Sequence, residues 1–174
     1  MTYSAIAVAN AFIEQAKARD ITDLTPMKLQ KLVFYAHAWS LVLNNCPLVS
    51  DKVYAWPYGP VIESVYHEFK GYGSHNITKP GTEFVWDDDP KAIVQAKYAA
   101  PQIPKSDTMT MSLIDAILDA YGNETAISLS NLTHRPGSAW ATTQDRHGGG
   151  TIRNYVIPND VIKECTAQEL GLGD

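Results

Sequence analysis

The segment that most constrains the fold is a long helix that begins with Thr25-Pro26. Threonine caps a helix well, and proline fits the first helical position because its missing N–H would have no partner there. Large apolar side chains then recur at helical spacing, at Leu29, Leu32, Val33, Ala36, Trp39 and Leu43. The sequence therefore predicts an amphipathic helix up to about Asn44, whose apolar face other elements must cover.

Shorter periodic segments occur on both sides of this helix, and residues typical of turns separate them. Further helices are predicted over 4–19, 61–70, 114–121, 125–134 and 159–168, with another beginning within 136–143. Strands are predicted over 52–56, 83–86 and 151–157, and 91–105 fits either an alanine-rich helix or an extended segment. The acidic run Asp87-Asp88-Asp89 is typical of a solvated loop. Together these elements predict a single domain over 1–174, of the α+β class and predominantly α-helical, with six to seven helices and a small antiparallel sheet.

The charge balance argues against binding to nucleic acid. The chain has 174 residues, a net charge of −5 and a pI near 5.5, whereas a protein that binds duplexes usually presents a basic face to the phosphates. Cys46 and Cys165 have no CxxC neighbour, which favours buried thiols in a reducing cytoplasm over a zinc site. We find no signal peptide and no run of about 20 apolar residues. These features predict a cytoplasmic protein that does not enter a membrane.

Three short patterns resemble sites of known chemistry, but each lacks the companion residues that this chemistry needs. His147-Gly148-Gly149-Gly150 resembles an esterase oxyanion loop, yet the chain has no GxSxG nucleophile motif. Glu63 and His67 are spaced as neighbours on a helix, without the further ligands of a metal site. The helix pair around Gly122 has helix-turn-helix spacing, but its second helix lacks Arg and Lys. We therefore predict no catalytic, metal-binding or cofactor-binding residues and expect the protein not to be an enzyme.

The segment Trp56-Pro57-Tyr58-Gly59-Pro60 has an unusual composition for a junction between a strand and a helix. Its prolines restrict the chain, so its two aromatic side chains are held with little loss of entropy. Rigid aromatic residues of this kind are common at the centres of protein–protein interfaces. The alternative is that Trp56 and Tyr58 cover the core beside Trp39.

Several segments resemble the Panacea domain, a family associated with phages and prophages. The resemblance begins with the helix motif Leu24-Thr25-Pro26-Met27-Lys28-Leu29-Gln30-Lys31-Leu32 and its Trp39. It continues through Ala55–Val61, Val65–Lys70, Tyr72-Gly73, Leu129–His134 and Gly137–Trp140. Relatives often have proline before this tryptophan, where the present chain has Ala139. The match extends in order over most of residues 4–165.

Members of this family are antitoxins, which resemble one another although their toxins differ widely. The resemblance implies that this protein neutralises a cognate protein toxin by direct contact, in a hetero-oligomer with it or as a homo-oligomer. One branch of the family instead delivers its toxin to an ATP-dependent protease, so a proteolytic adaptor is the first alternative. A hydrolase is the second, and it would require His67, His134 or His147 to converge in a pocket. The residues that we expect to contact the toxin are Trp56, Tyr58, Gly59, Pro60, His67, His134 and Trp140.

Overall fold

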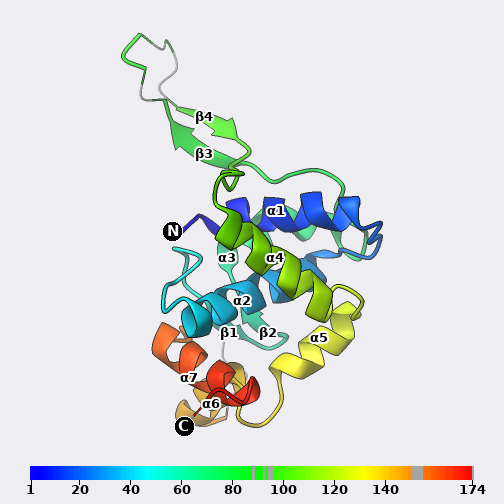
Figure 1. Ribbon diagram of the computed structural model, residues 1–174, viewed down its shortest axis with the longest axis vertical. Helices are drawn as coiled ribbons and strands as arrows, with labels where there is room; N and C mark the ends of the chain where they lie inside the picture. The colour runs from blue at the N-terminus through cyan, green and yellow to red at the C-terminus, as the bar shows by residue number, and fades with distance from the viewer. Residues whose placement is uncertain (88, 92, 94–95, 150–154, 174) are drawn as a thin grey trace.

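Residues 1–87, 89–91, 93, 96–149 and 155–173, which the computed structural model describes, contain seven α-helices and two pairs of antiparallel strands (Figure 1). The helices are α1 (Ala5–Ala18), α2 (Pro26–Leu43), α3 (Glu63–Phe69), α4 (Thr108–Tyr121), α5 (Ala126–Thr133), α6 (Ala139–Arg146) and α7 (Asn159–Glu169). The strands are β1 (Tyr54–Trp56), β2 (Gly59–Val61), β3 (Glu83–Trp86) and β4 (Ala96–Ala99), and a 3₁₀ helix, η1 (Lys70–Tyr72), follows α3. The expected α+β, predominantly helical class is confirmed, with the strands in two separate pairs.

Helix α2 lies at the centre of the helical part of the molecule. Thr25 caps it as predicted, because its hydroxyl oxygen accepts a hydrogen bond from the Lys28 N–H at 3.4 Å. The helix packs against α1, α3, α4, α5, α7 and β2. Its burial therefore extends beyond the predicted stripe to Phe34 and Tyr35. The assignment of Leu43 to the buried face is wrong: this side chain is 55% exposed, in the last turn of the helix before the chain reverses.

The helix expected over 61–70 is shorter than predicted and follows a β-hairpin. Val61 belongs to β2, which pairs with β1 in the register Tyr54↔Val61, Ala55↔Pro60 and Trp56↔Gly59. The segment 57–60 thus reverses the chain within one hairpin instead of joining a strand directly to a helix. Helix α3 begins at Glu63, two residues after the end of β2.

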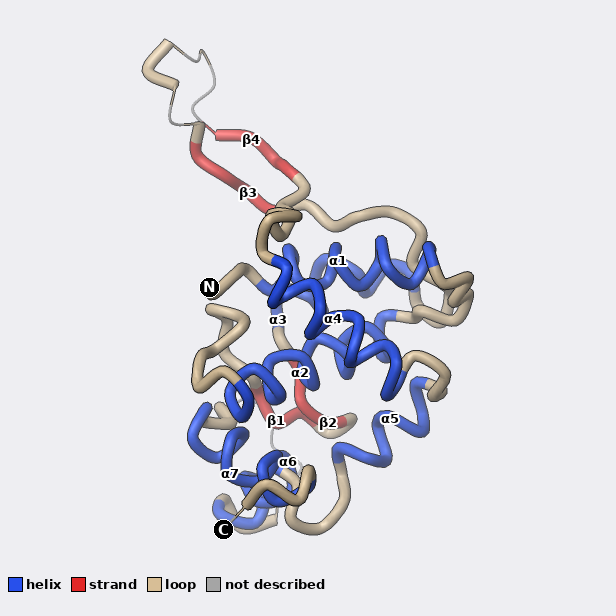
Figure 2. The backbone as a smooth tube through the Cα atoms, viewed as in Figure 1, coloured by secondary structure: helices blue, strands red, loops and turns tan. Residues whose placement is uncertain are grey.

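The pair β3–β4 forms a ribbon that projects from the helices at one end of the molecule (Figures 1 and 2). Within the ambiguous segment 91–105, Ala96–Ala99 is extended, since it pairs with Glu83–Trp86, while residues 92, 94 and 95 lie outside the described residues. The Asn10 side chain holds the base of this ribbon. Its amide nitrogen donates to the carbonyl oxygens of Gly81 and Pro101, at 3.0 and 2.9 Å, and its oxygen accepts from the Gly81 N–H at 2.7 Å. Asn10 is therefore a polar residue that is buried among apolar side chains of α1 because its amide group pairs with the backbone at the base of the ribbon.

The remaining boundaries follow local signals. Helix α6 begins at Ala139, within the predicted range 136–143, because Ser138 caps it by accepting the Ala141 N–H at 3.1 Å. Residues 151–154 of the expected strand 151–157, Asp88 of the acidic run and Gly150 lie outside the described residues. Of that strand, Val156 forms an isolated antiparallel bridge with Tyr54. None of the helices in the described ranges has both the length and the apolar character needed to cross a bilayer.

The central position of α2 predicts a large effect of shortening Leu32, which is fully buried. Leu32→Ala should lower the free energy of unfolding by about 2–5 kcal/mol, because it removes apolar contacts and leaves a cavity. Leu43→Ala is the matched control on the same helix and should change it by about 0.5 kcal/mol or less. Urea unfolding of both variants checks this, and equal losses would contradict the orientation of α2.

Candidate functional site

The hairpin β1–β2 brings most of the predicted contact residues to one place. Pro57 and Tyr58 form its two-residue turn, between the paired residues Trp56 and Gly59. Gly59 has a φ of +108°, a conformation that side chains disfavour. A Cβ atom at this position would also lie 2.6 Å from the Thr133 hydroxyl and 2.7 Å from the Lys31 ammonium. The hairpin therefore packs against its neighbours so closely that only glycine fits here.

Side chains of the C-terminal helices hold the backbone of the first half of the hairpin. Trp140 donates from Nε1 to the Trp56 carbonyl oxygen at 2.7 Å. The Nε2 atom of His134 lies 2.9 Å from the Pro57 carbonyl oxygen. Ser130 donates to the Tyr58 carbonyl oxygen at 3.0 Å, and Gln144 donates to that of Ala55 at 3.3 Å. The four successive carbonyl groups of residues 55–58 are thus paired with side chains of α5 and α6 and with His134, which follows α5.

Helix α2 holds the second half of the hairpin. The Gln30 side chain both donates to the carbonyl oxygen of Ile62, at 2.9 Å, and accepts from its N–H, at 3.1 Å. The Lys31 ammonium donates to the Pro60 carbonyl oxygen at 3.2 Å. Both side chains are buried in the middle of the molecule. Burial also lowers the pKa of Lys31 to about 7, because the charged form loses its hydration.

A mainly apolar pocket of about 250 Å³ lies between α2, the hairpin and α3. Met27, Trp56, Val61 and Tyr66 provide most of its apolar wall, and Lys31 contributes to it as well. The Trp56 and Tyr66 rings meet edge to face, with their centroids 4.9 Å apart. Tyr58, at the tip of the hairpin, is 72% exposed beside this pocket.

The seven residues predicted from the sequence therefore fall into four groups. Trp56 and Tyr58 line the pocket, and Gly59 and Pro60 lie buried within the hairpin itself. His134 and Trp140 lie against one another behind the hairpin, with ring centroids 4.1 Å apart and polar atoms directed at its carbonyl groups. His67 is exposed on α3 and contacts the ring of Tyr66, but it does not line the pocket.

The histidines named for a hydrolase have different surroundings. His134 lies between the carbonyl oxygens of Pro57 and Ser130, whereas His147 stacks on Tyr155 with ring centroids 3.6 Å apart. His67 contacts Tyr66 on the outer side of α3. In the part of the chain that the structure describes, no three His, Cys, Asp or Glu side chains lie close enough together to hold a metal ion. Helix α5, the second helix of the helix-turn-helix spacing, packs against α2.

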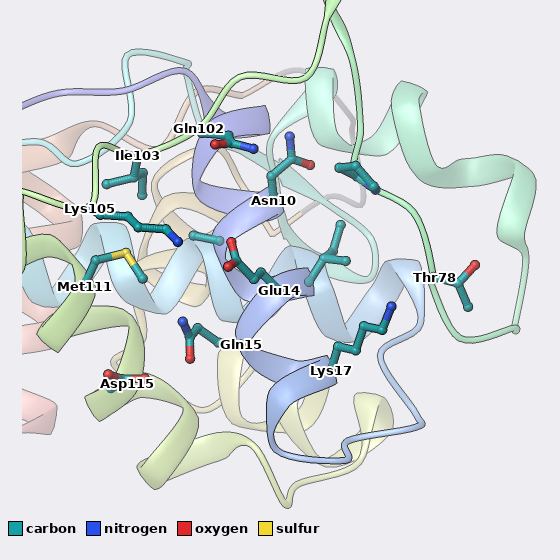
Figure 3. A pocket seen from close by; sticks show the side chains of 13 residues that line it. Asn10, Glu14, Gln15, Lys17, Thr78, Gln102, Ile103, Lys105, Met111 and Asp115 are labelled. Atoms are coloured by element: carbon teal, nitrogen blue, oxygen red, sulfur yellow. The ribbon is translucent and has the colours of Figure 1, made fainter.

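A larger hollow of about 570 Å³ lies along α1, and Figure 3 shows the side chains around it. These come from α1, from α4 and from the two segments next to the ribbon, 78–80 and 102–105. Charges of both signs line this hollow, with Glu14 and Asp115 among the acids and Lys17 and Lys105 among the bases. The described residues that line it include no histidine or cysteine, and among them no nucleophile lies beside a base.

The structure assigns positions to two sets of residues that the sequence patterns did not indicate. Gln30 and Lys31 were recognised as part of a motif, but not as the residues that hold the hairpin. The only available signal was the presence of polar residues inside an otherwise apolar helix. The second set is the aromatic face of the ribbon, where Phe84 contacts both Trp86 and Tyr98, with ring centroids 5.7 and 5.6 Å apart. Trp86 and Tyr98 are 72% and 75% exposed.

Comparison with known proteins relates this arrangement to one family. The family model for the SocA-like antitoxin, Panacea domain, matches residues 29–141. Antitoxin SocA of Caulobacter vibrioides (strain NA1000 / CB15N) is 29% identical over 158 residues, which are 91% of this chain and 79% of that protein. No solved structure matches the chain. The matched range includes the hairpin together with Gln30, Lys31, His134 and Trp140.

The bond from Trp140 to the hairpin gives a stability prediction. Trp140→Phe keeps an aromatic ring but leaves the Trp56 carbonyl oxygen without this donor, so the free energy of unfolding should fall by about 1–3 kcal/mol. Trp86→Phe, at an exposed position of the ribbon, is the control and should stay within about 0.5 kcal/mol of the parent protein. Thermal or urea unfolding measures both, and an unchanged Trp140→Phe protein would argue against a structural role of this bond.

Proposed function

Because the chain belongs to the SocA-like antitoxin family of the Panacea domain, we propose that it neutralises a cognate protein toxin by direct binding, without catalysing a reaction. We further propose that the hairpin and the adjoining pocket contact the toxin. The observation that carries this proposal is the exposed Tyr58 at the tip of a hairpin whose backbone is held on both sides by helices.

The rigidity of the hairpin supports a role in binding. Binding loses conformational entropy for every flexible side chain and loop that becomes ordered at the interface. Here the backbone around Tyr58 is already fixed by Ser130, His134 and Trp140, so binding a partner would cost little conformational entropy at this segment. An exposed aromatic ring on such a support has the properties of a hot-spot residue.

The same contacts support a non-enzymatic role. His134 is the histidine that contacts the hairpin turn. Its ring nitrogens are directed at the carbonyl oxygens of Pro57 and Ser130. Its surroundings are those of a residue that positions a backbone. We therefore assign His134 and Trp140 to support of the binding surface, with Trp56 and Tyr58 at the surface itself.

The proposal is tested by neutralisation in the absence of a protease. The purified chain is added to a candidate toxin, taken from the adjacent gene, in a reaction that contains no ATP-dependent protease. Direct binding should suppress the toxin's activity, with saturation near equimolar amounts. Suppression that occurs only after the protease is added would support the proteolytic adaptor instead, and no suppression in either reaction would contradict the antitoxin assignment for this pair.

The contact surface is tested with a pair of exposed tyrosines. Tyr58→Ala should change the free energy of unfolding by about 0.5 kcal/mol or less and weaken toxin binding by about 2 kcal/mol or more, roughly thirtyfold. Tyr98→Ala, which removes a similarly exposed ring from β4, is the control and should retain the parent affinity. The measurements are a thermal melt and a calorimetric titration of each variant. Full affinity of a stable Tyr58→Ala protein would remove the hairpin from the interface.

A further inference from the structure

A second pocket, of about 270 Å³, lies where α4, α5 and α7 pack on α2, and it shares no lining residue with the pocket beside the hairpin. Its aromatic wall consists of Tyr35 and Trp39 of α2 and of Tyr121, the last residue of α4. The Tyr35 and Tyr121 rings stack with their centroids 4.5 Å apart, and Trp39 meets Tyr121 edge to face at 6.0 Å. Further apolar surface comes from Leu132, Pro136 and Leu170. The pocket therefore offers apolar contacts to a ligand side chain.

The lining also contains one acid and one base, Glu169 of α7 and Arg135, which follows α5. Both are exposed, so they lie at the opening of the pocket. Among the described residues neither side chain has an ion-pair or hydrogen-bond partner. Loss of hydration raises the pKa of the Glu169 carboxyl group, and the nearby Arg135 opposes this shift. The two opposite charges thus lie near one another without forming an ion pair.

The hydroxyl group of Tyr35 is a buried polar group directed at the same place. Tyr35 is 5% exposed, and within the described parts of the chain its hydroxyl has no hydrogen-bond partner. Burial raises the pKa of Tyr35, Tyr121 and Glu169 raise it further, and Arg135 lowers it. Because such interactions weaken with distance, the hydroxyl of Tyr35 lies near these three groups, all of which line the pocket. A buried hydroxyl without a partner is unfavourable, and a polar ligand atom would supply one.

We propose that this pocket binds a free α-amino acid with a large apolar side chain, its ammonium group on Glu169 and its carboxylate on Arg135. The Tyr35 hydroxyl can donate to the ligand carboxylate or accept from the ligand ammonium group. The apolar side chain of the ligand lies against Trp39, Tyr121 and the aliphatic part of the lining. This site is separate from the proposed toxin contact and does not depend on it.

A zwitterion fits the two charges better than a ligand with a single charge does. A cation that pairs with Glu169 is repelled by Arg135, and an anion that pairs with Arg135 is repelled by Glu169. A free α-amino acid carries its ammonium and carboxylate groups on the same carbon atom, whereas a peptide carries them at opposite ends. The volume of about 270 Å³ corresponds to roughly nine water molecules at about 30 Å³ each. It therefore suits one amino acid better than a longer peptide.

The test is an NMR titration of the full chain at pH 7 with L-phenylalanine and two derivatives, each of which lacks one charge. L-phenylalanine amide lacks the carboxylate, and N-acetyl-L-phenylalanine lacks the ammonium group. L-phenylalanine should bind about fivefold more tightly than either derivative, or better, because each derivative loses one ion pair. Shifts are expected at Trp39 and Tyr121 but not at Trp86 on the ribbon. Glycine, which has both charges and no side chain, should bind more weakly than L-phenylalanine.

Two variants at exposed positions assign the charges. Glu169→Gln should bind L-phenylalanine no more tightly than the parent protein binds the N-acetyl derivative. Arg135→Gln should bind it no more tightly than the parent protein binds the amide. Glu164→Gln, at an exposed position of α7 outside the pocket, is the matched control and should retain the parent affinity. Thermal melts check that all three variants are folded.

Three results would overturn the proposal. The first, which requires no variant, is that the parent protein binds none of the three phenylalanine compounds, or binds a derivative as tightly as the amino acid. Equal binding of the amide would assign the pocket to a cation, and equal binding of the N-acetyl derivative would assign it to an anion. The second is a preference for the zwitterion that persists in folded Glu169→Gln and Arg135→Gln. The third is binding of glycine as tightly as L-phenylalanine, which would exclude the apolar lining from the site.

Discussion

The backbone N–H and carbonyl groups of the hairpin β1–β2 that are not paired between its own strands need hydrogen-bond partners, because helices enclose the hairpin. This requirement determines how several helices are placed around it. Strands of three residues form few hydrogen bonds with each other, and a buried carbonyl group without a donor is costly. These side-chain partners come from both halves of the chain: Gln30 and Lys31 from α2, and Ser130, His134 and Trp140 from the C-terminal half. The hairpin is thus the point at which α2, α5 and α6 are joined by polar contacts as well as by packing.

This arrangement explains the function of several residues of the family motif in physical terms. The Gln30 side chain forms two hydrogen bonds with the backbone of Ile62, one to its carbonyl oxygen and one from its N–H, as a residue of a paired strand would. Gly59 is favoured because its φ of +108° suits glycine and because the Thr133 and Lys31 side chains approach it closely. Such a network fixes the position of the hairpin more narrowly than apolar packing alone, since each donor has a particular acceptor. The family resemblance therefore includes residues that hold the hairpin, such as Gln30, as well as Trp56 and Tyr58, which line the pocket beside it.

The helices were largely predictable from the sequence because their signals are local. Thr25-Pro26 determined the start of α2, and Ser4 and Thr125 cap α1 and α5 in the same way. The error at Leu43 arose because periodicity identifies a face but not where the neighbouring elements end. Strand β4 could not be assigned, since the alanines of Ala96–Ala99 have a low preference for strands and only pairing with β3 decides its conformation.

The site was predictable in part, for the same reason. Pro57 and Gly59 indicated a turn and the aromatic residues indicated a surface, and the structure brings six of the seven named residues to one hairpin. The roles of His134 and Trp140 depend on contacts with residues 77 and 84 positions away in sequence. The burial of Lys31 likewise depends on a hairpin that follows 29 positions later. Local sequence patterns, such as helical spacing or capping residues, do not indicate contacts between residues so far apart in the chain.

The attachment of the ribbon through Asn10 has a consequence for how the protein opens. Beyond this clamp at Gly81 and Pro101, β3 and β4 are held mainly by each other, and a two-stranded ribbon is only marginally stable in water. Its strands can therefore separate by a local fluctuation while α2 and the surrounding helices stay folded. Amide protons of β3 and β4 would exchange with solvent far sooner than those in the middle of α2. Asn10 is the buried member of the contacts at the base of the ribbon, which also include the bonds from Ser4 to Glu83 and from Thr82 to Glu68.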